Sequence, residues 1–144
     1  MTRSPDIDEL RKRRQLNVQQ QNLLEEDAIR KSATWFRTHL HEVPAPIRSF
    51  LAAHGIDLQS AVDVEFSDLR DVGLSGFYRG LVVTADARFW RWELLLDDAH
   101  SAIESVEEWR DVTSEHRPDD HVRGTGRNYA SLCLTVLREL NAGD

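Results

Sequence analysis

The residues best suited to chemistry lie in one polar loop near the C-terminal end of the chain. Three arginines surround a glycine-rich segment that leads straight into a predicted helix: Arg117, Arg123, Gly124, Thr125, Gly126 and Arg127. Backbone N–H groups at a helix start, the helix dipole and guanidinium groups together can bind a phosphate or a carboxylate. The spacing differs from a P-loop, and no Lys-Ser/Thr pair follows. The alternative is an entry loop whose glycines permit the turn and whose arginines are offset by neighbouring acids.

Histidine and cysteine offer less chemistry. Zinc needs three or four converging ligands, but His39 and His41 point to different sides of a predicted helix, and His116 and His121 flank only a pair of aspartates. Cys133, the only cysteine, lies on the apolar stripe of a predicted helix, where cysteine is usually a small buried hydrophobe. We therefore predict no catalytic residue, no metal site and no cofactor.

One face of a predicted β-hairpin is a second candidate surface. In its second strand, alternate residues from Trp90 to Leu96 form a wholly apolar face, which predicts core. The opposite face mixes aromatic, basic, acidic and aliphatic side chains, as protein interfaces often do. Provided that no helix covers it, the predicted protein-interaction residues are Tyr78, Phe89, Arg91, Glu93 and Leu95.

The elements that position these residues predict an α+β fold. Residues 61–67 alternate between apolar and acidic, as in a half-buried strand. Residues 102–113 fit a helix, because Ile103, Val106 and Trp109 recur every three residues, or a strand with one bulge. We favour the strand. The prediction is an antiparallel β-meander of three to four strands, packed by N-terminal helices and a C-terminal helix, with strands at about 61–67, 76–84, 88–96 and 102–113.

The N-terminal helical pattern is too long for a compact body. A helix over residues 5–41 would extend about 55 Å, so it either breaks or projects. The predicted buried stripe is Leu24, Ala28, Ile29, Ala33, Phe36 and Leu40. Residues 1–20 are predicted to be a loosely attached helix, a tail or an oligomer contact, and residues 21–144 a single domain. The basic run at residues 11–14 is predicted to be a solvated face, since acids follow at 25–27.

Composition excludes several classes of function. The chain has 144 residues, a formal net charge of −7 and sixteen arginines against two lysines. A net negative charge argues against general nucleic-acid binding. No apolar run approaches the roughly 20 residues that span a bilayer, and the first residues lack the apolar stretch of a secretory signal. We expect a soluble, cytoplasmic protein with no membrane contact.

The function that these features favour is a non-enzymatic module that binds another protein or a second copy of itself. Small acidic α+β proteins with a β-meander include the immunity proteins that neutralise bacterial toxins. This chain has their general character but no motif that would assign it to them. The alternative is a small-ligand or anion-binding domain, enzymatic or not, that uses the arginine-rich loop.

Overall fold

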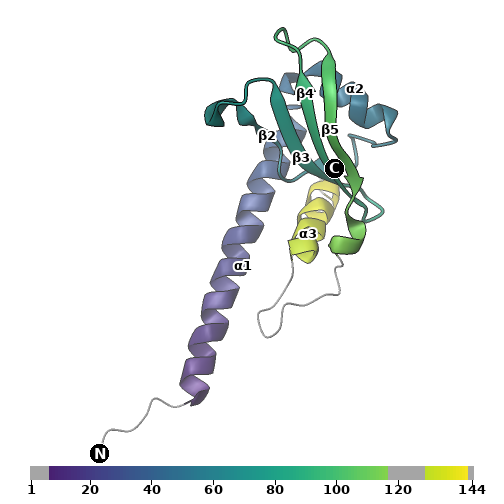
Figure 1. Ribbon diagram of the computed structural model, residues 1–144. Helices are drawn as coiled ribbons and strands as arrows, with labels where there is room; N and C mark the ends of the chain where they lie inside the picture. The colour runs from purple at the N-terminus through teal and green to yellow at the C-terminus, as the bar shows by residue number, and fades with distance from the viewer. Residues whose placement is uncertain (1–6, 117–128, 143–144) are drawn as a thin grey trace, which may run out of the picture.

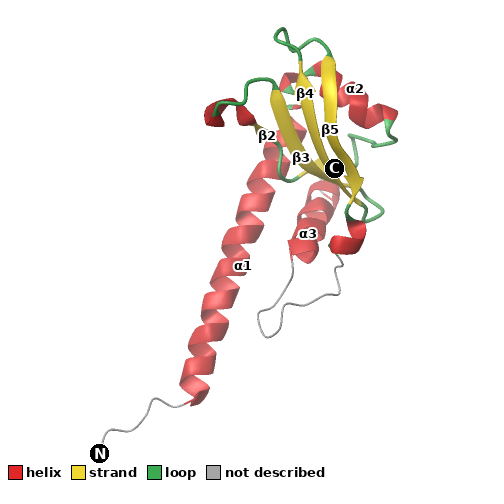
Figure 2. Ribbon diagram, viewed as in Figure 1, coloured by secondary structure: helices red, strands yellow, loops and turns green. Residues whose placement is uncertain are grey.

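An antiparallel sheet with helices on both faces forms the body of the protein (Figures 1 and 2). The computed structural model describes residues 7–116 and 129–142. The helices are α1 (Ile7–Thr38), α2 (Ala45–Ala53) and α3 (Tyr129–Ala142), with short 3-10 helices η1 (Leu40–Glu42), η2 (Leu69–Val72) and η3 (Thr113–Glu115). The strands are β1 (Val62–Asp63), β2 (Ser67–Asp68), β3 (Phe77–Val83), β4 (Phe89–Leu96) and β5 (Ile103–Asp111). The predicted α+β architecture is therefore confirmed.

The sheet follows the chain order β1-β3-β4-β5, and β2 also pairs with β3. The predicted single strand at 61–67 is thus two short strands on one neighbour. Asp63 explains the interruption: its Oδ1 accepts a hydrogen bond from the backbone N–H of Glu65 at 3.0 Å, which turns the chain.

The hairpin β3–β4 has the register expected from a turn at residues 85–87. Phe77 pairs with Leu95, and Val83 pairs with Phe89. The turn closes through two backbone hydrogen bonds between Thr84 and the segment that follows, and Ala87 has a φ of 64°. A three-residue hairpin loop needs a left-handed residue at this point, and here alanine takes it instead of glycine.

The segment with the helix-like spacing is strand β5. Its pairing with β4 shifts twice, between Glu93 and Leu94 and between Leu95 and Leu96. Each shift inserts one extra residue, so side chains three apart return to the same face. Ile103, Val106 and Trp109 consequently pair with Leu96, Leu94 and Trp92.

Each face of the sheet has its own core. On one face, α2 and the end of α1 cover a cluster that contains Trp92, Leu94 and Leu96, as predicted for the apolar face of β4. On the other face, α1 and α3 cover Leu81, Val83 and Phe89. Figure 1 shows α2 behind the strands and α3 at their lower ends.

Helix α1 does not break; its first half projects from the body (Figure 1). The predicted buried stripe begins later than expected. Ile29, Ala33 and Phe36 are buried, but Ala28 is exposed and Leu24 is 71% exposed. Leu24 lies on the side of the helix opposite Ile29, Ala33 and Phe36, so the body does not cover it.

Candidate functional site

Among the described residues, α1 and α3 cover only half of their face of the sheet. Pairing places its side chains in rows across β3 and β4: Val83 with Phe89, then Leu81 with Arg91, then Arg79 with Glu93, and last Phe77 with Leu95. The first row is buried, whereas every side chain of the last two rows reaches solvent. We call the uncovered part the open surface, which comprises Phe77, Arg79, Arg91, Glu93 and Leu95.

Three of the five predicted interaction residues lie together on the open surface. Arg91, Glu93 and Leu95 are each half-buried, at the border of the covered part or beyond it. Phe89 points to the same face but is fully buried in the core against α1 and α3. Helix α3 therefore removes Phe89 from the predicted surface.

Tyr78 lies on the opposite face. It pairs with Leu94, and paired residues in antiparallel strands point to the same side. Tyr78 is buried in the Trp92 core, and its hydroxyl forms a hydrogen bond with His100 Nδ1 at 2.9 Å. Its place in the predicted mixed surface belongs instead to Arg79, the next residue of β3.

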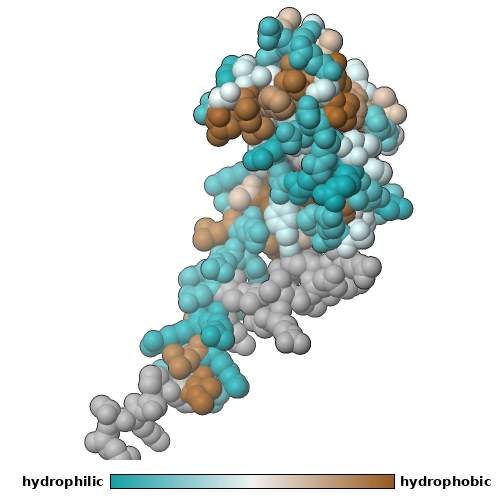
Figure 3. Space-filling model, in the orientation of Figure 1, coloured by the Kyte–Doolittle hydropathy of each residue, from teal (hydrophilic) through white to brown (hydrophobic). Residues whose placement is uncertain are grey.

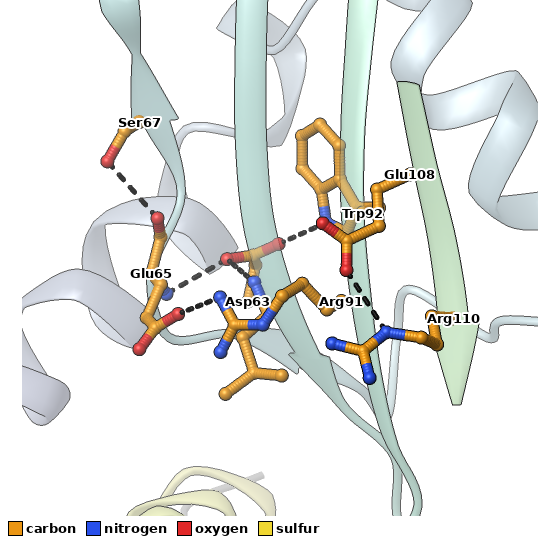
Figure 4. A network of polar contacts seen from close by, with 8 residues as sticks. Asp63, Glu65, Ser67, Arg91, Trp92, Glu108 and Arg110 are labelled. Atoms are coloured by element: carbon orange, nitrogen blue, oxygen red, sulfur yellow. Dashed lines mark hydrogen bonds and ion pairs between the residues drawn. The ribbon is translucent and has the colours of Figure 1, made fainter. Parts of the chain in front are cut away.

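The charges of the open surface are only partly paired (Figure 4). Arg91 donates to Glu65 at 3.1 Å across the border of the covered half. Of the residues that the structure describes, none forms an ion pair with Arg79 or Glu93.

Two pairs of like charges face each other across β4 and β5. Arg91 pairs with Arg110, and Glu93 pairs with Glu108. Directly opposed like charges destabilise a sheet, and here Arg110 relieves part of the repulsion by donating to Glu108 at 3.2 Å (Figure 4).

A polar pocket of about 480 Å³ opens where α1 passes the sheet. It is lined by Ser32, Glu65, Phe66, Ser67, Arg79 and Arg91. Two guanidinium groups, two hydroxyls and one carboxylate can hold an acidic group from outside, with Arg79 as a cation that no described residue pairs with.

Asp63 lies on the other face of the sheet and is fully buried. Its carboxylate accepts hydrogen bonds from Trp92 Nε1 at 2.7 Å and from the Leu81 N–H at 3.2 Å, besides the Glu65 N–H (Figure 4). Burial raises the pKa of Asp63 to about 7, against the opposing effect of these three donors. Gly80 makes the site sterically feasible, since a Cβ there would lie 2.7 Å from Asp63 Cγ. Asp63 of β1 thus connects three strands, because its buried carboxylate binds Leu81 of β3 and Trp92 of β4.

The predicted anion-binding residues, from Arg117 through Gly124 to Arg127, lie outside the described residues. The ends of the described chain on either side of them are informative. Burial, and then the charge of Arg91, lowers the pKa of His116. Burial chiefly, with the nearby Glu65 carboxylate, raises the pKa of Tyr129. The rings of His116 and Tyr129 lie 6.2 Å apart between centroids.

Other chemistry has little support. Cys133 is fully buried in the core, and burial raises the pKa of its thiol to about 12. Within residues 7–116 and 129–142, no three His, Cys, Asp or Glu side chains gather in a way that could hold a metal ion. In the same ranges, no helix combines the length and the apolar character needed to cross a membrane.

Comparison with models of known protein families, with curated proteins and with solved structures finds no match.

Proposed function

We propose that the chain is a non-enzymatic protein-binding module whose contact site is the open surface. The observation that carries this proposal concerns Arg79 and Glu93, which lie opposite each other on β3 and β4. Neither of them forms an ion pair with a described residue. They are framed by the half-buried Phe77 and Leu95. Arginine and aromatic side chains surrounded by polar groups are the usual anchors of protein interfaces.

Hydrophobic side chains next to the open surface extend it. Val72 and Leu74, in and just after η2, are 71% and 45% exposed. Figure 3 shows hydrophobic surface at the end of the sheet where η2 and the start of β3 lie, with hydrophilic surface over the strands below it. A partner would therefore bury the apolar end and place an acid against Arg79 and a base against Glu93.

Site-specific photocrosslinking in the cells that make the protein tests this proposal. A photoreactive phenylalanine analogue replaces Arg79 in one variant. In the control variant it replaces Ala53, an exposed residue of α2 on the far side of the sheet. We expect one defined protein adduct from position 79 and none from position 53.

Charge reversal then identifies the surface with purified proteins. Arg79→Glu should weaken binding of the crosslinked partner at least about tenfold, which corresponds to roughly 1.4 kcal/mol. Arg138→Glu, an exposed arginine of α3, should leave the affinity unchanged. Equal crosslinking from both positions, or equal affinity of both reversal variants, would refute the proposed surface.

The polar pocket favours a second candidate function, the binding of a small anionic ligand. Arg79 and Arg91 line the pocket, and the described residues on both sides of the arginine-rich loop lie on the same face of the sheet, where His116 stacks on Phe89 and Tyr129 packs against the core that contains Phe89. Calorimetric titration with phosphate and with nucleotides tests this function. Heat of binding that disappears in both Arg79→Ala and Arg123→Ala supports it, and the absence of heat together with an unchanged melting temperature excludes it.

A further inference from the structure

The projecting half of α1 has a solvent-exposed stripe on the side opposite its buried residues. Residues three and four apart share one side of a helix, and here they lie opposite Ile29, Ala33 and Phe36. We call them the outer stripe: Leu10, Arg13, Asn17, Gln20, Leu24, Asp27 and Lys31. Leu16 and Leu23, both exposed, flank it.

The outer stripe continues into a groove on the body. The groove has a volume of about 390 Å³ and is lined by Arg30, Lys31, Thr34, Trp35, Thr38 and His39. Trp35 in this groove is 41% exposed. Most helical stability in proteins comes from packing an amphipathic face, and among the described residues no element packs on this side of the projecting half (Figure 1). The outer stripe is therefore a candidate surface for another molecule to bind.

The charges along α1 identify that occupant. Residues 11–14 are all basic, and residues 25–27 are all acidic. None of the four basic residues forms an ion pair with a residue that the structure describes. A helix that carries opposite charges at two separate places can complement itself when a second copy runs in the reverse direction.

Antiparallel pairing about a two-fold axis near residue 20 brings the opposite charges of the outer stripe together. Arg13 then lies beside Asp27 of the second copy, and Leu16 at the edge of the stripe approaches Leu24 of the second copy. The overlap of residues 7–33 is about 40 Å of helix at 1.5 Å per residue. Parallel pairing would instead place four basic residues against four basic residues, which is unfavourable.

We propose that two copies of this chain associate through the outer stripes of α1 in an antiparallel, two-fold symmetric pair. Such an interface is isologous, because each copy offers the same surface to the other. The bodies then lie at opposite ends of the helix pair, and the open surface of each copy stays free. This proposal rests on α1 alone and is independent of the function proposed for the open surface.

Charge-swapped variants of the full chain test the pairing by sedimentation velocity over a dilution series. One variant reverses the basic charge of the outer stripe with Arg13→Glu, and the second reverses its acidic charge with Asp27→Arg. The third variant combines both changes. We expect the wild type to dimerise and each single reversal to raise the dimer dissociation constant at least tenfold. The combined variant should return close to the wild-type value, because its opposite charges meet again.

Circular dichroism and melting temperature confirm that each variant retains a folded body. A wild type that stays monomeric throughout the series overturns the proposal. A combined variant that dimerises no better than the single reversals overturns it as well, because attraction between the two segments is then not the cause. Single reversals that dimerise like the wild type also contradict it, since they indicate parallel pairing or another interface.

Disulfide crosslinking provides a second readout of direction. The chain has one cysteine, Cys133, which is buried, so an introduced cysteine reacts without interference. Gln20→Cys, close to the two-fold axis, should form a disulfide-linked dimer. Leu10→Cys, on the same stripe but far from the axis, should not. Crosslinking at both positions indicates parallel helices and overturns the antiparallel arrangement.

Discussion

The two faces of the sheet differ in how completely the described helices cover their large side chains. On the Trp92 face, α2 and the end of α1 enclose the aromatic and aliphatic residues of β3 and β4, and the buried charge of Asp63 has three hydrogen-bond donors. On the opposite face, α3 closes only the lower half, and Arg79 and Glu93 have no ion-pair partner among the described residues. The described residues pack the first face and leave charged side chains at the surface of the second, where we propose that a partner binds.

Removal of the buried carboxylate should produce the largest loss of stability. Asp63→Ala leaves the Trp92 indole N–H and the Leu81 N–H buried without acceptors, and each such group costs about 1–3 kcal/mol. We expect a loss of about 4 kcal/mol in the free energy of unfolding, measured by denaturant titration. A loss below about 1 kcal/mol would show that Asp63 does not hold the Trp92 face together.

Two adjacent residues of β3 compare the faces directly. In Gly80→Ala the new methyl group collides with the Asp63 carboxylate, and overpacking of this kind costs about 3 kcal/mol. Arg79→Ala, one residue earlier on the open surface, should change stability by less than about 0.5 kcal/mol. Similar losses in both variants would remove the distinction between the faces.

The pH dependence of stability sharpens the role of Asp63. Its pKa is about 7 in the folded protein and 3.8 when the residue is free, so the folded state binds this proton more tightly. The resulting stability is fully present below about pH 4 and is lost as the pH rises through about 7, with a slope of at most about 1.4 kcal/mol per pH unit.

Asp63→Asn provides the reference for that measurement, because it removes the titrating proton and leaves the other carboxylates in place. The difference in unfolding free energy between wild type and Asp63→Asn should fall over this pH range. A flat difference would show that Asp63 keeps one protonation state throughout, with its three N–H donors outweighing its burial.

The smallest expected effect on stability belongs to Glu93. Glu93→Gln relieves the repulsion from Glu108, its partner on β5, and should leave stability unchanged or raise it by a few tenths of a kcal/mol. The same variant should weaken partner binding. A clear loss of stability would instead mark Glu93 as a structural residue.

Sequence patterns predict the sheet better than they predict its surfaces. Alternation identifies β3, β4 and the apolar Trp92 face, because burial on one side of a strand leaves a period of two. The bulges of β5 replace that period with three, which is why its residues also fit a helix. The register of the hairpin, once applied consistently, moves Tyr78 to the Trp92 face and brings Arg79 beside Glu93.

Other features depend on packing that has no local signature. Nothing in the sequence of β4 indicates that α3 covers Phe89 but stops short of Glu93. The alternation in residues 61–67 places Asp63 among exposed acids, whereas Gly80 and Trp92, distant in sequence, make room for it and bind it. Leu24 is apolar like the buried residues of α1, yet it lies on the side of the helix opposite Ile29, Ala33 and Phe36.

The most direct test of the open surface is the affinity of the crosslinked partner for a variant that changes this surface alone. Isothermal titration calorimetry compares the wild type with Arg79→Ala combined with Leu95→Ala, and with the control Arg138→Ala. We predict a loss of at least about a hundredfold, roughly 2.8 kcal/mol, for the double variant and an unchanged affinity for the control. An unchanged affinity for a folded double variant would contradict the claim that the open surface is where this protein binds.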